Sequence, residues 1–229
     1  MEISNDERYY ISLIKNTNTP LTIFDIGCNK GFYTDYLLKT IGNNHNYYLF
    51  DPSERFYNIV SEKFKMFDNI HINNVGISDL NEENINFYEL INSNDDVEGM
   101  SSLTNRAVFS NYDYKVNKIN TINLDGFITE QNITNIDFIK IDTEGQELKI
   151  LNGLKDSFGK KIINLIQIEY GDCAIENGYN LNHILEFINQ YDYTLYIYDN
   201  LNLTEVNLNN SNNYISLPWC NFLIIRNGQ

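Results

Sequence analysis

The segment that decides the fold of this chain reads Thr22-Ile23-Phe24-Asp25-Ile26-Gly27-Cys28-Asn29-Lys30-Gly31-Phe32-Tyr33-Thr34. Its first half is the short apolar run of a strand buried on both faces, and its second half opens a helix. Gly27 and Gly31 allow positive φ and a close approach of the backbone. The segment therefore predicts a strand, a tight turn and a helix whose first amide groups point at a bound ligand.

The spacing of the two glycines narrows the class of ligand. A dinucleotide site needs G-x-G-x-x-G so that a pyrophosphate can reach the helix N-terminus, but three larger residues separate Gly27 from Gly31 and no third glycine follows. The pattern D-x-G-x-x-x-G instead resembles motif I of the class I S-adenosylmethionine (SAM) methyltransferases. In that family the glycine loop wraps the methionine part of the cofactor, and the acid helps to hold it. The candidate cofactor residues here are Asp25, Gly27, Cys28, Asn29, Gly31, Tyr33 and Thr34.

A second landmark, Asp51-Pro52, follows the apolar run Tyr47-Tyr48-Leu49-Phe50. An acid at the end of the second strand of an α/β nucleotide fold accepts hydrogen bonds from ribose hydroxyls. Pro52 suits the first turn of a following helix. Taken alone, Asp51 fits an ordinary helix-capping acid better, but together with the glycine loop it predicts a ribose contact.

The third landmark is a buried strand, an acidic turn and a helix, Ile136-Asp137-Phe138-Ile139-Lys140-Ile141-Asp142-Thr143-Glu144-Gly145-Gln146-Glu147-Leu148. It strongly resembles the signature of the FkbM-like methyltransferases, and the resemblance covers residues 20–226. Val75-Gly76-Ile77-Ser78-Asp79 agrees with the same family. Three positions depart from it, because Asp51 stands where the family usually has Glu, and Cys28 and Gly76 stand where it usually has alanine. The resemblance adds Gly76, Ile77, Ser78 and Asp142 to the candidate cofactor residues.

The resemblance implies a Rossmann-like α/β fold with a doubly wound, mostly parallel sheet of seven strands, the last of them antiparallel. Alternation of helices and strands points to the same architecture, with the site at the carboxyl ends of the strands. The predicted strands are 21–26, 46–50, 70–75, 136–141, 162–169, 193–198 and 219–226, and the predicted helices are 31–41, 53–66, 146–156 and 181–190. We expect residues 1–229 to form a single domain.

Two segments stand apart from this alternation. Residues 1–19 contain a lead-in helix over 5–14, which we expect to pack over the cofactor cleft or against the partner of a homodimer. Residues 80–118 form an inserted hairpin and loop, with a strand over 83–90 and a polar loop over 91–113, and a further strand is predicted over 119–124. We interpret that loop as an active-site lid that orders on substrate binding, and a disordered decorative loop is the alternative.

The charge of the chain limits which classes of molecule it can bind. The chain carries 31 acidic and 16 basic residues, for a net charge of −15, and its Lys and Arg residues are scattered. Nucleic-acid phosphates would be repelled, so nucleic acid is an unfavoured partner, while a glycan or a small molecule is compatible. Three isolated cysteines, no signal-peptide pattern at the start and no apolar run that could span a bilayer predict a cytoplasmic protein with no membrane contact.

The chemistry implied is methyl transfer from a sulfonium, in which the donor is already activated and an alcohol acceptor must still lose its proton. Asp142 and Glu144 follow the fourth predicted strand of the sheet, and Glu169 follows the fifth. We take Asp142 or Glu144 as the general base, and Glu169 as a group that orients the substrate or shares a Mg²⁺ ion with Asp142. For each acid, the structural alternative is a residue that stabilises a helix N-terminus. No histidine follows a strand end.

Three hypotheses of function remain. The first is a SAM-dependent O-methyltransferase acting on a hydroxyl of a sugar, a glycan or a natural product, as the resemblance implies. The second is a non-catalytic domain that keeps the fold to bind a glycan or a protein. The third is an RNA methyltransferase or an N-methyltransferase, which the acidic balance and the lack of an N-P-P-Y-type tetrapeptide disfavour.

Overall fold

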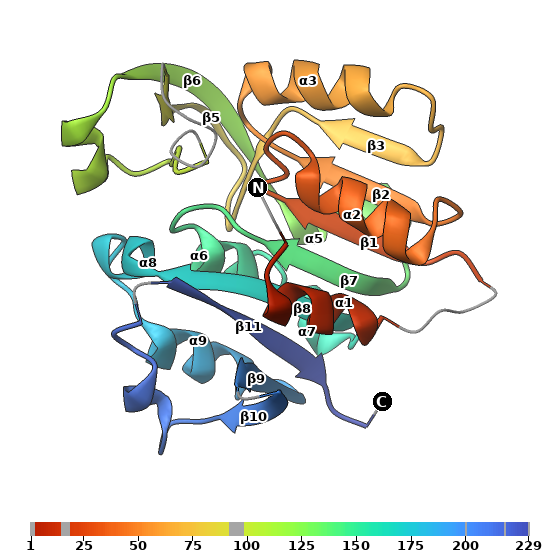
Figure 1. The fold of residues 1–229 in the computed structure, drawn as a ribbon, viewed down its shortest axis with the longest axis vertical. Helices are drawn as coiled ribbons and strands as arrows, with labels where there is room; N and C mark the ends of the chain where they lie inside the picture. Colours follow the sequence, from red (N-terminus) through yellow and green to blue (C-terminus); the bar gives the residue numbers. More distant parts are fainter. Residues whose placement is uncertain (1–2, 15–18, 92–98, 200, 218, 229) are drawn as a thin grey trace.

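The computed structural model describes residues 3–14, 19–91, 99–199, 201–217 and 219–228. Its centre is an eight-stranded sheet (Figure 1). The strands lie side by side in the order β10 (Asn202–Val206), β9 (Tyr193–Asp199), β11 (Trp219–Arg226), β8 (Ile163–Gly171), β7 (Ile136–Ile141), β1 (Thr22–Ile26), β2 (Asn46–Phe50) and β3 (Ile70–Asn73). Strands β3, β2, β1, β7 and β8 are parallel, whereas β11 is antiparallel to both β8 and β9. The predicted fold class is therefore confirmed.

Helices cover both faces of this sheet, and two apolar cores result. One face packs against α1 (Asn5–Ser12), α2 (Phe32–Ile41) and α3 (Glu54–Phe64), and the other against α5 (Leu124–Glu130), α6 (Glu147–Asn152), α7 (Lys155–Gly159) and α9 (Leu181–Ile188). Successive side chains of a strand point to opposite faces, so Ile23 joins the first core and Phe24 the second. In β7, Phe138 likewise joins the first core and Ile139 the second. This division explains why both strands are mostly apolar.

The insertion forms a second, smaller sheet. Its three strands have the order β4 (Gly76–Ser78), β6 (Tyr114–Asn123) and β5 (Glu82–Leu90), and β5 and β6 make the antiparallel hairpin. The expected lid falls partly on residues 92–98, which lie outside the described residues. Its described part runs from Gly99 through the short helix η1 (Ala107–Asn111), and Ser102 bridges to Tyr88 of β5. Ordering on substrate binding stays a prediction.

Several elements differ from those predicted, and most of the differences are shifts of a few residues at their ends. The third strand of the large sheet ends at Asn73 rather than at 75, and residues 76–78 belong to the second sheet. Helix 146–156 is divided into α6 and α7 at Gly153, where a β-carbon would lie 2.6 Å from the Ser78 carbonyl oxygen. Strand β6 starts at Tyr114, five residues before the predicted strand. An eighth strand, β10, was not predicted, because its short polar sequence is mostly exposed at the sheet edge.

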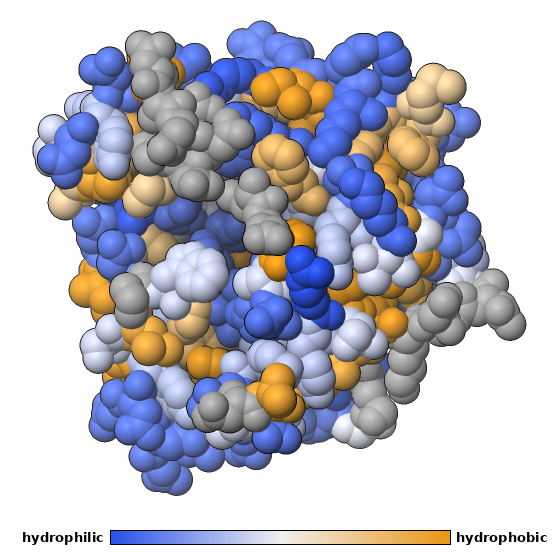
Figure 2. All heavy atoms as spheres, viewed as in Figure 1, coloured by the Kyte–Doolittle hydropathy of each residue, from blue (hydrophilic) through white to orange (hydrophobic). Residues whose placement is uncertain are grey.

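Helix α1 lies across the carboxyl-terminal strands. The Tyr10 hydroxyl donates to the Asn221 carbonyl of β11 at 2.9 Å and accepts from the Tyr198 amide of β9 at 3.0 Å. These two bonds anchor the helix so that Ser4 and Glu7 reach the cavity described below. On the face shown in Figure 2, polar residues predominate and apolar ones are scattered. Within the described part of the chain, none of the helices is long and apolar enough to cross a bilayer.

Candidate active site

A cavity of about 540 Å³ lies at the carboxyl ends of β1, β2, β7 and β8. This volume is in the range of roughly 300–1,000 Å³ that is usual for small-molecule sites. Most of the residues predicted from the sequence to bind the cofactor line it. These are Gly27, Cys28, Asn29, Tyr33, Asp51, Pro52, Gly76, Ile77 and Asp142. The candidate catalytic residues Glu144 and Glu169 line the same cavity.

The turn after β1 depends on the glycine at position 27. Gly27 has a φ of 80°, and a β-carbon on it would lie 1.8 Å from the Asp142 carbonyl oxygen. Its amide and that of Cys28 both donate to the Phe50 carbonyl, at 2.9 and 3.1 Å. The absent side chain thus lets the ends of β1, β2 and β7 meet at one point, which forms the floor of the cavity.

Asp51 is held by backbone amides at the end of β2. One carboxylate oxygen accepts from the Asn29 amide at 2.8 Å, and the other accepts from the Ser53 amide at 2.9 Å. Burial raises the pKa of Asp51 to about 7, although both of these hydrogen bonds act in the opposite direction. Each oxygen keeps a second lone pair, so this fixed carboxylate can still accept hydrogen bonds from a diol.

Four of the predicted cofactor residues do not line the cavity. Asp25 is fully buried beneath it, where one of its oxygens accepts from the Thr34 hydroxyl at 2.5 Å. Gly31 has a φ of 69°, and a β-carbon there would lie 2.7 Å from the Phe64 ring, so this glycine serves helix packing. Ser78 is buried in β4. A role for these four in cofactor binding would be indirect.

Three carboxylates gather at the ends of β7 and β8. Asp142, Glu144 and Glu169 each place one oxygen within 4.8 Å of the other two. The sequence placed Asp142 and Glu169 on separate strand ends, and the parallel register of β7 and β8 brings these ends together. Buried Lys140 donates to Asp142 at 2.8 Å and lies 3.8 Å from Asp25.

The three acids have different affinities for protons. Burial opposes ionisation of Asp142, but Lys140 and a hydrogen bond from Glu169 outweigh it and lower the pKa of Asp142. Burial and the Asp142 carboxylate raise the pKa of Glu169 well above its usual range, so Glu169 carries the proton of this pair. Burial, followed by repulsion from Asp142, raises the pKa of Glu144 to about 8 in spite of Arg106.

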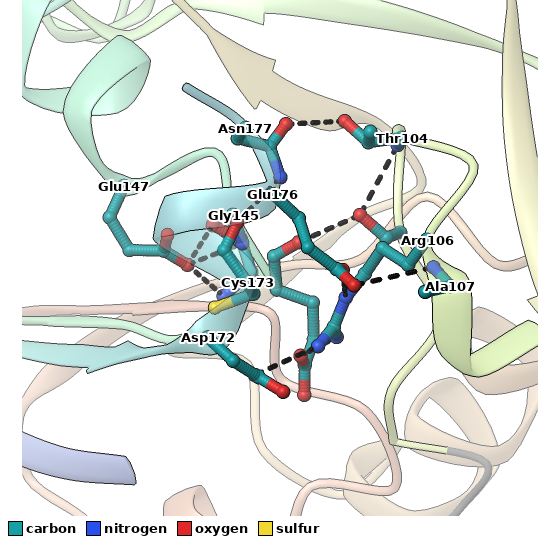
Figure 3. A network of polar contacts seen from close by, with 12 residues as sticks. Thr104, Arg106, Ala107, Gly145, Glu147, Asp172, Cys173, Glu176 and Asn177 are labelled. Atoms are coloured by element: carbon teal, nitrogen blue, oxygen red, sulfur yellow. Dashed lines mark hydrogen bonds and ion pairs between the residues drawn. The ribbon is translucent and has the colours of Figure 1, made fainter. Parts of the chain in front are cut away.

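Arg106 is a residue of this site that the sequence analysis missed. It comes from the insertion, and its guanidinium group contacts the carboxylates of Glu144, Asp172 and Glu176 (Figure 3). Both Arg106 and Asp172, the first residue of α8 (Asp172–Glu176), line the cavity. One signal was present in the sequence, because Arg106 is the only Lys or Arg between Leu80 and Asp113.

Glu147 stabilises the turn at the start of α6, which is the structural alternative given above for the acids of this segment. One of its oxygens accepts from the Thr143 amide, the Thr143 hydroxyl and the Gly145 amide, at 3.0, 2.9 and 3.2 Å. The other accepts from the Tyr179 hydroxyl at 2.5 Å. Glu147 therefore shapes the turn, whereas Glu144 faces the cavity from it.

Two further side chains complete the lining. Gln146 is 2 % exposed, and its Oε1 atom has no hydrogen-bond partner among the described residues. A buried polar atom of this kind in a cavity wall is suited to receive a ligand's donor group. Trp219 lies at the cavity with 57 % of its surface exposed. None of the described histidines lines the cavity.

Several solved structures share this fold. The FkbM methyltransferase from Methylobacillus flagellatus KT matches with a TM-score of 0.55 and 13% identity over 90% of this chain, which spans only 43% of that protein's length. An rRNA methylase from Streptococcus thermophilus matches with a TM-score of 0.51 and 13% identity over 99% of both chains. The O-methyltransferase from Bacillus cereus, solved with S-adenosylhomocysteine (SAH), matches with a TM-score of 0.50 and 12% identity over 97% of this chain and 81% of that one. At these identities the likeness is one of fold.

Sequence comparison identifies the family more narrowly. Among curated proteins, none matches this chain. A family model for the methyltransferase FkbM domain matches residues 25–195, a range that holds the glycine turn, Asp51 and all three clustered acids. The predicted resemblance is thereby confirmed, and the chain belongs to the FkbM-domain family of methyltransferases.

Proposed function

We propose that this methyltransferase uses SAM to methylate a hydroxyl group of a sugar or a natural product, with Glu144 as the general base. The observation that carries the proposal is one continuous cavity, which joins the glycine turn and Asp51 at one end to Glu144 and Glu169 at the other. A cofactor bound by the first end would present its methyl group toward the second.

The cavity lining fits this cofactor. The backbone of residues 27–29 would hold its amino-acid tail, and Asp51 would accept hydrogen bonds from its ribose hydroxyls. Ile77, Phe87 and Phe56 offer apolar surface to its adenine ring. When bound, SAM supplies a methyl group on a positively charged sulfur, which is a good leaving group.

The protonation states assign the roles of the acids. A general base works best when its pKa lies near the working pH, and the pKa of Glu144 is raised to about 8. Glu144 would accept the hydroxyl proton as the acceptor oxygen bonds to the methyl carbon. Asp142 is a weaker base because Lys140 holds it ionised. Protonated Glu169 and the free Gln146 oxygen would orient the acceptor by hydrogen bonds.

A divalent cation fits this arrangement poorly. Asp142 is already paired with Lys140, and Glu144 with Arg106, so a metal ion would have to displace both cations. We derive no catalytic step through Mg²⁺. If chelation with EDTA abolished methyl transfer and added Mg²⁺ restored it, this assignment of the acids would have to change.

The charge of the site supports an uncharged acceptor. Asp142, Glu144, Glu169 and Asp172 line its acceptor end, and the cations that lie beside these acids among the described residues, Lys140 and Arg106, are engaged by them. A phosphate or carboxylate on the acceptor would meet repulsion without a free partner. The same argument disfavours RNA, and the net charge of −15 adds to it.

Calorimetric titration with SAH tests the cofactor assignment. We expect binding to the wild type, a loss of affinity in Asp51→Ala, and wild-type affinity in the matched control Asp192→Ala, whose carboxylate is exposed and does not line the cavity. No binding by folded wild-type protein would end the proposal.

Transfer of labelled methyl groups from SAM to a panel of neutral sugars tests the reaction. Glu144→Gln should retain SAH binding and lose transfer by about 100-fold or more. Binding of SAH without transfer to any hydroxyl acceptor would instead favour the non-catalytic alternative.

A further inference from the structure

One short segment of the insertion is fastened to the catalytic turn. We call residues 102–107 the strap. The Ser102 hydroxyl donates to the Glu144 carbonyl at 2.7 Å, and the Ala107 amide donates to Glu176 at 3.3 Å. Thr104 is hydrogen-bonded to Asn177 (Figure 3). The strap thus contacts both the turn after β7 and the helix after β8, the two places from which the acids enter the cavity.

Arg106 makes the central contact of the strap. Its side chain is only 1% exposed, and its Nε atom donates to Glu176 at 2.9 Å and its Nη2 atom to Asp172 at 3.1 Å. The third nitrogen, Nη1, donates to Glu144. A guanidinium group is planar and always charged, so it can hold carboxylates in fixed directions in a way that a flexible ammonium group cannot.

Glu144 needs such a partner. Its φ is 56°, a left-handed conformation that is costly for a residue with a β-carbon, and its side chain is 18% exposed. The charged and titratable groups that face it are Asp142, Glu147, Glu169, Cys173 and Arg106. Arg106 is the only cation among these described groups, so without it nothing would offset the repulsion between the Asp142 and Glu144 carboxylates, and Glu144 would turn toward solvent.

Lys140 cannot replace Arg106 in this role. Its ammonium group donates to Asp142 at 2.8 Å and lies within 3.8 Å of Asp25, so it neutralises the other side of the acid cluster. Lys140 therefore pairs with Asp142, and Arg106 is the only cation among the described residues that pairs with Glu144.

We propose that Arg106 is a positioning residue of the methyl-transfer site, which holds the Glu144 carboxylate in the cavity and makes the inserted segment part of the active site. This inference rests on the proposed function, because it assumes that Glu144 is the base. The three clustered acids come from the ends of β7 and β8 in the large sheet. The insertion supplies the cation that holds one of them in place.

Labelling of carboxylates by a water-soluble carbodiimide, read by mass spectrometry, reports how accessible Glu144 is. We expect Glu144 to react about tenfold or more faster in Arg106→Gln than in wild type, because a hydrogen-bonded ion pair is lost. Arg106→Lys should restore part of the protection. Thr104→Val is the matched control, since it removes a strap contact without touching Glu144, and it should label like wild type.

Two outcomes would overturn the inference. One is unchanged labelling of Glu144 in folded Arg106→Gln, and the other is equal acceleration in Arg106→Gln and Thr104→Val, which would mean that Arg106 only anchors the strap. If Arg106→Gln does not fold, hydrogen exchange of the Ala107 and Phe109 amides in Glu144→Ala replaces it. Exchange about tenfold faster than in wild type supports the pairing, and unchanged exchange contradicts it. Failure of SAH to bind would affect the proposed function but leave these labelling results valid.

Discussion

Replacing Gly27 with alanine should damage both the fold and the cofactor end of the cavity. A β-carbon at this position would lie 1.8 Å from the Asp142 carbonyl oxygen, whereas real β-carbons essentially never approach another atom closer than 3.0 Å. The turn and the end of β7 would therefore have to separate by more than 1 Å (3.0 − 1.8 = 1.2 Å). Hydrogen bonds resist this separation on both sides, from the Gly27 amide to Phe50 and from the Asp142 amide to Ile26.

The magnitude follows from two contributions. An L-residue at a φ of 80° costs about 1–2 kcal/mol relative to glycine. Weakening the two backbone hydrogen bonds adds about 0.5–1.5 kcal/mol each. We expect Gly27→Ala to lower the free energy of unfolding by about 2–5 kcal/mol, as the sum of these contributions.

Urea unfolding followed by circular dichroism measures this loss, and calorimetry with SAH measures the accompanying loss of affinity. Gly126→Ala is the matched control. No atom lies within 4 Å of a β-carbon built there and Gly126 is helical, so this change should leave stability unchanged or raise it by about 0.5–1 kcal/mol. If Gly27→Ala proved as stable as wild type and bound SAH equally well, the close approach of β1 and β7 described here would be wrong.

Three further predictions concern buried titratable groups. Burial raises the pKa of Asp51 to about 7, so its ionisation costs folding free energy, and wild type should lose stability relative to Asp51→Asn as the pH rises from about 4 to 7. Lys140→Met leaves the carboxylates of Asp25 and Asp142 without their cation and should cost about 3–5 kcal/mol at pH 7, with partial recovery in acid as these groups take up protons. Burial raises the pKa of all three cysteine thiols, so iodoacetamide at pH 8 should alkylate them much faster in denaturant than in the native protein.

Unfolding measurements test the first two predictions, and thiol labelling tests the third. Urea unfolding at several pH values follows the first two, and parallel stability curves for wild type and Asp51→Asn would contradict the first. A Lys140→Met variant as stable as wild type at pH 7 would show that Asp25 and Asp142 do not depend on this ammonium group. Mass spectrometry counts alkylated thiols, and rapid labelling of Cys28 in native protein would contradict its burial in the turn.

Much of the fold could be predicted from local patterns. Largely apolar runs marked the central strands of the large sheet, such as β7 and β8, because a strand covered on both faces has no fully polar side. Strand β10 was not predicted, because it lies at the edge of the sheet and its sequence is mostly polar. The division of the predicted helix was not predicted either, and it falls at Gly153, which packs closely against Ser78, a residue distant in the sequence.

The sequence by itself determined most strands and helices of the large sheet, the turn at Gly27 and the acids near the ends of β2, β7 and β8, because each depends on neighbouring residues. Only the tertiary structure decided which of those acids meet and what charge each carries. Arg106 joins Glu144 across 38 residues of sequence, and Gly27 makes room for the backbone of Asp142. Such contacts arise when separate strand ends converge, and burial and counter-charges at that convergence set the pKa values that no local pattern encodes.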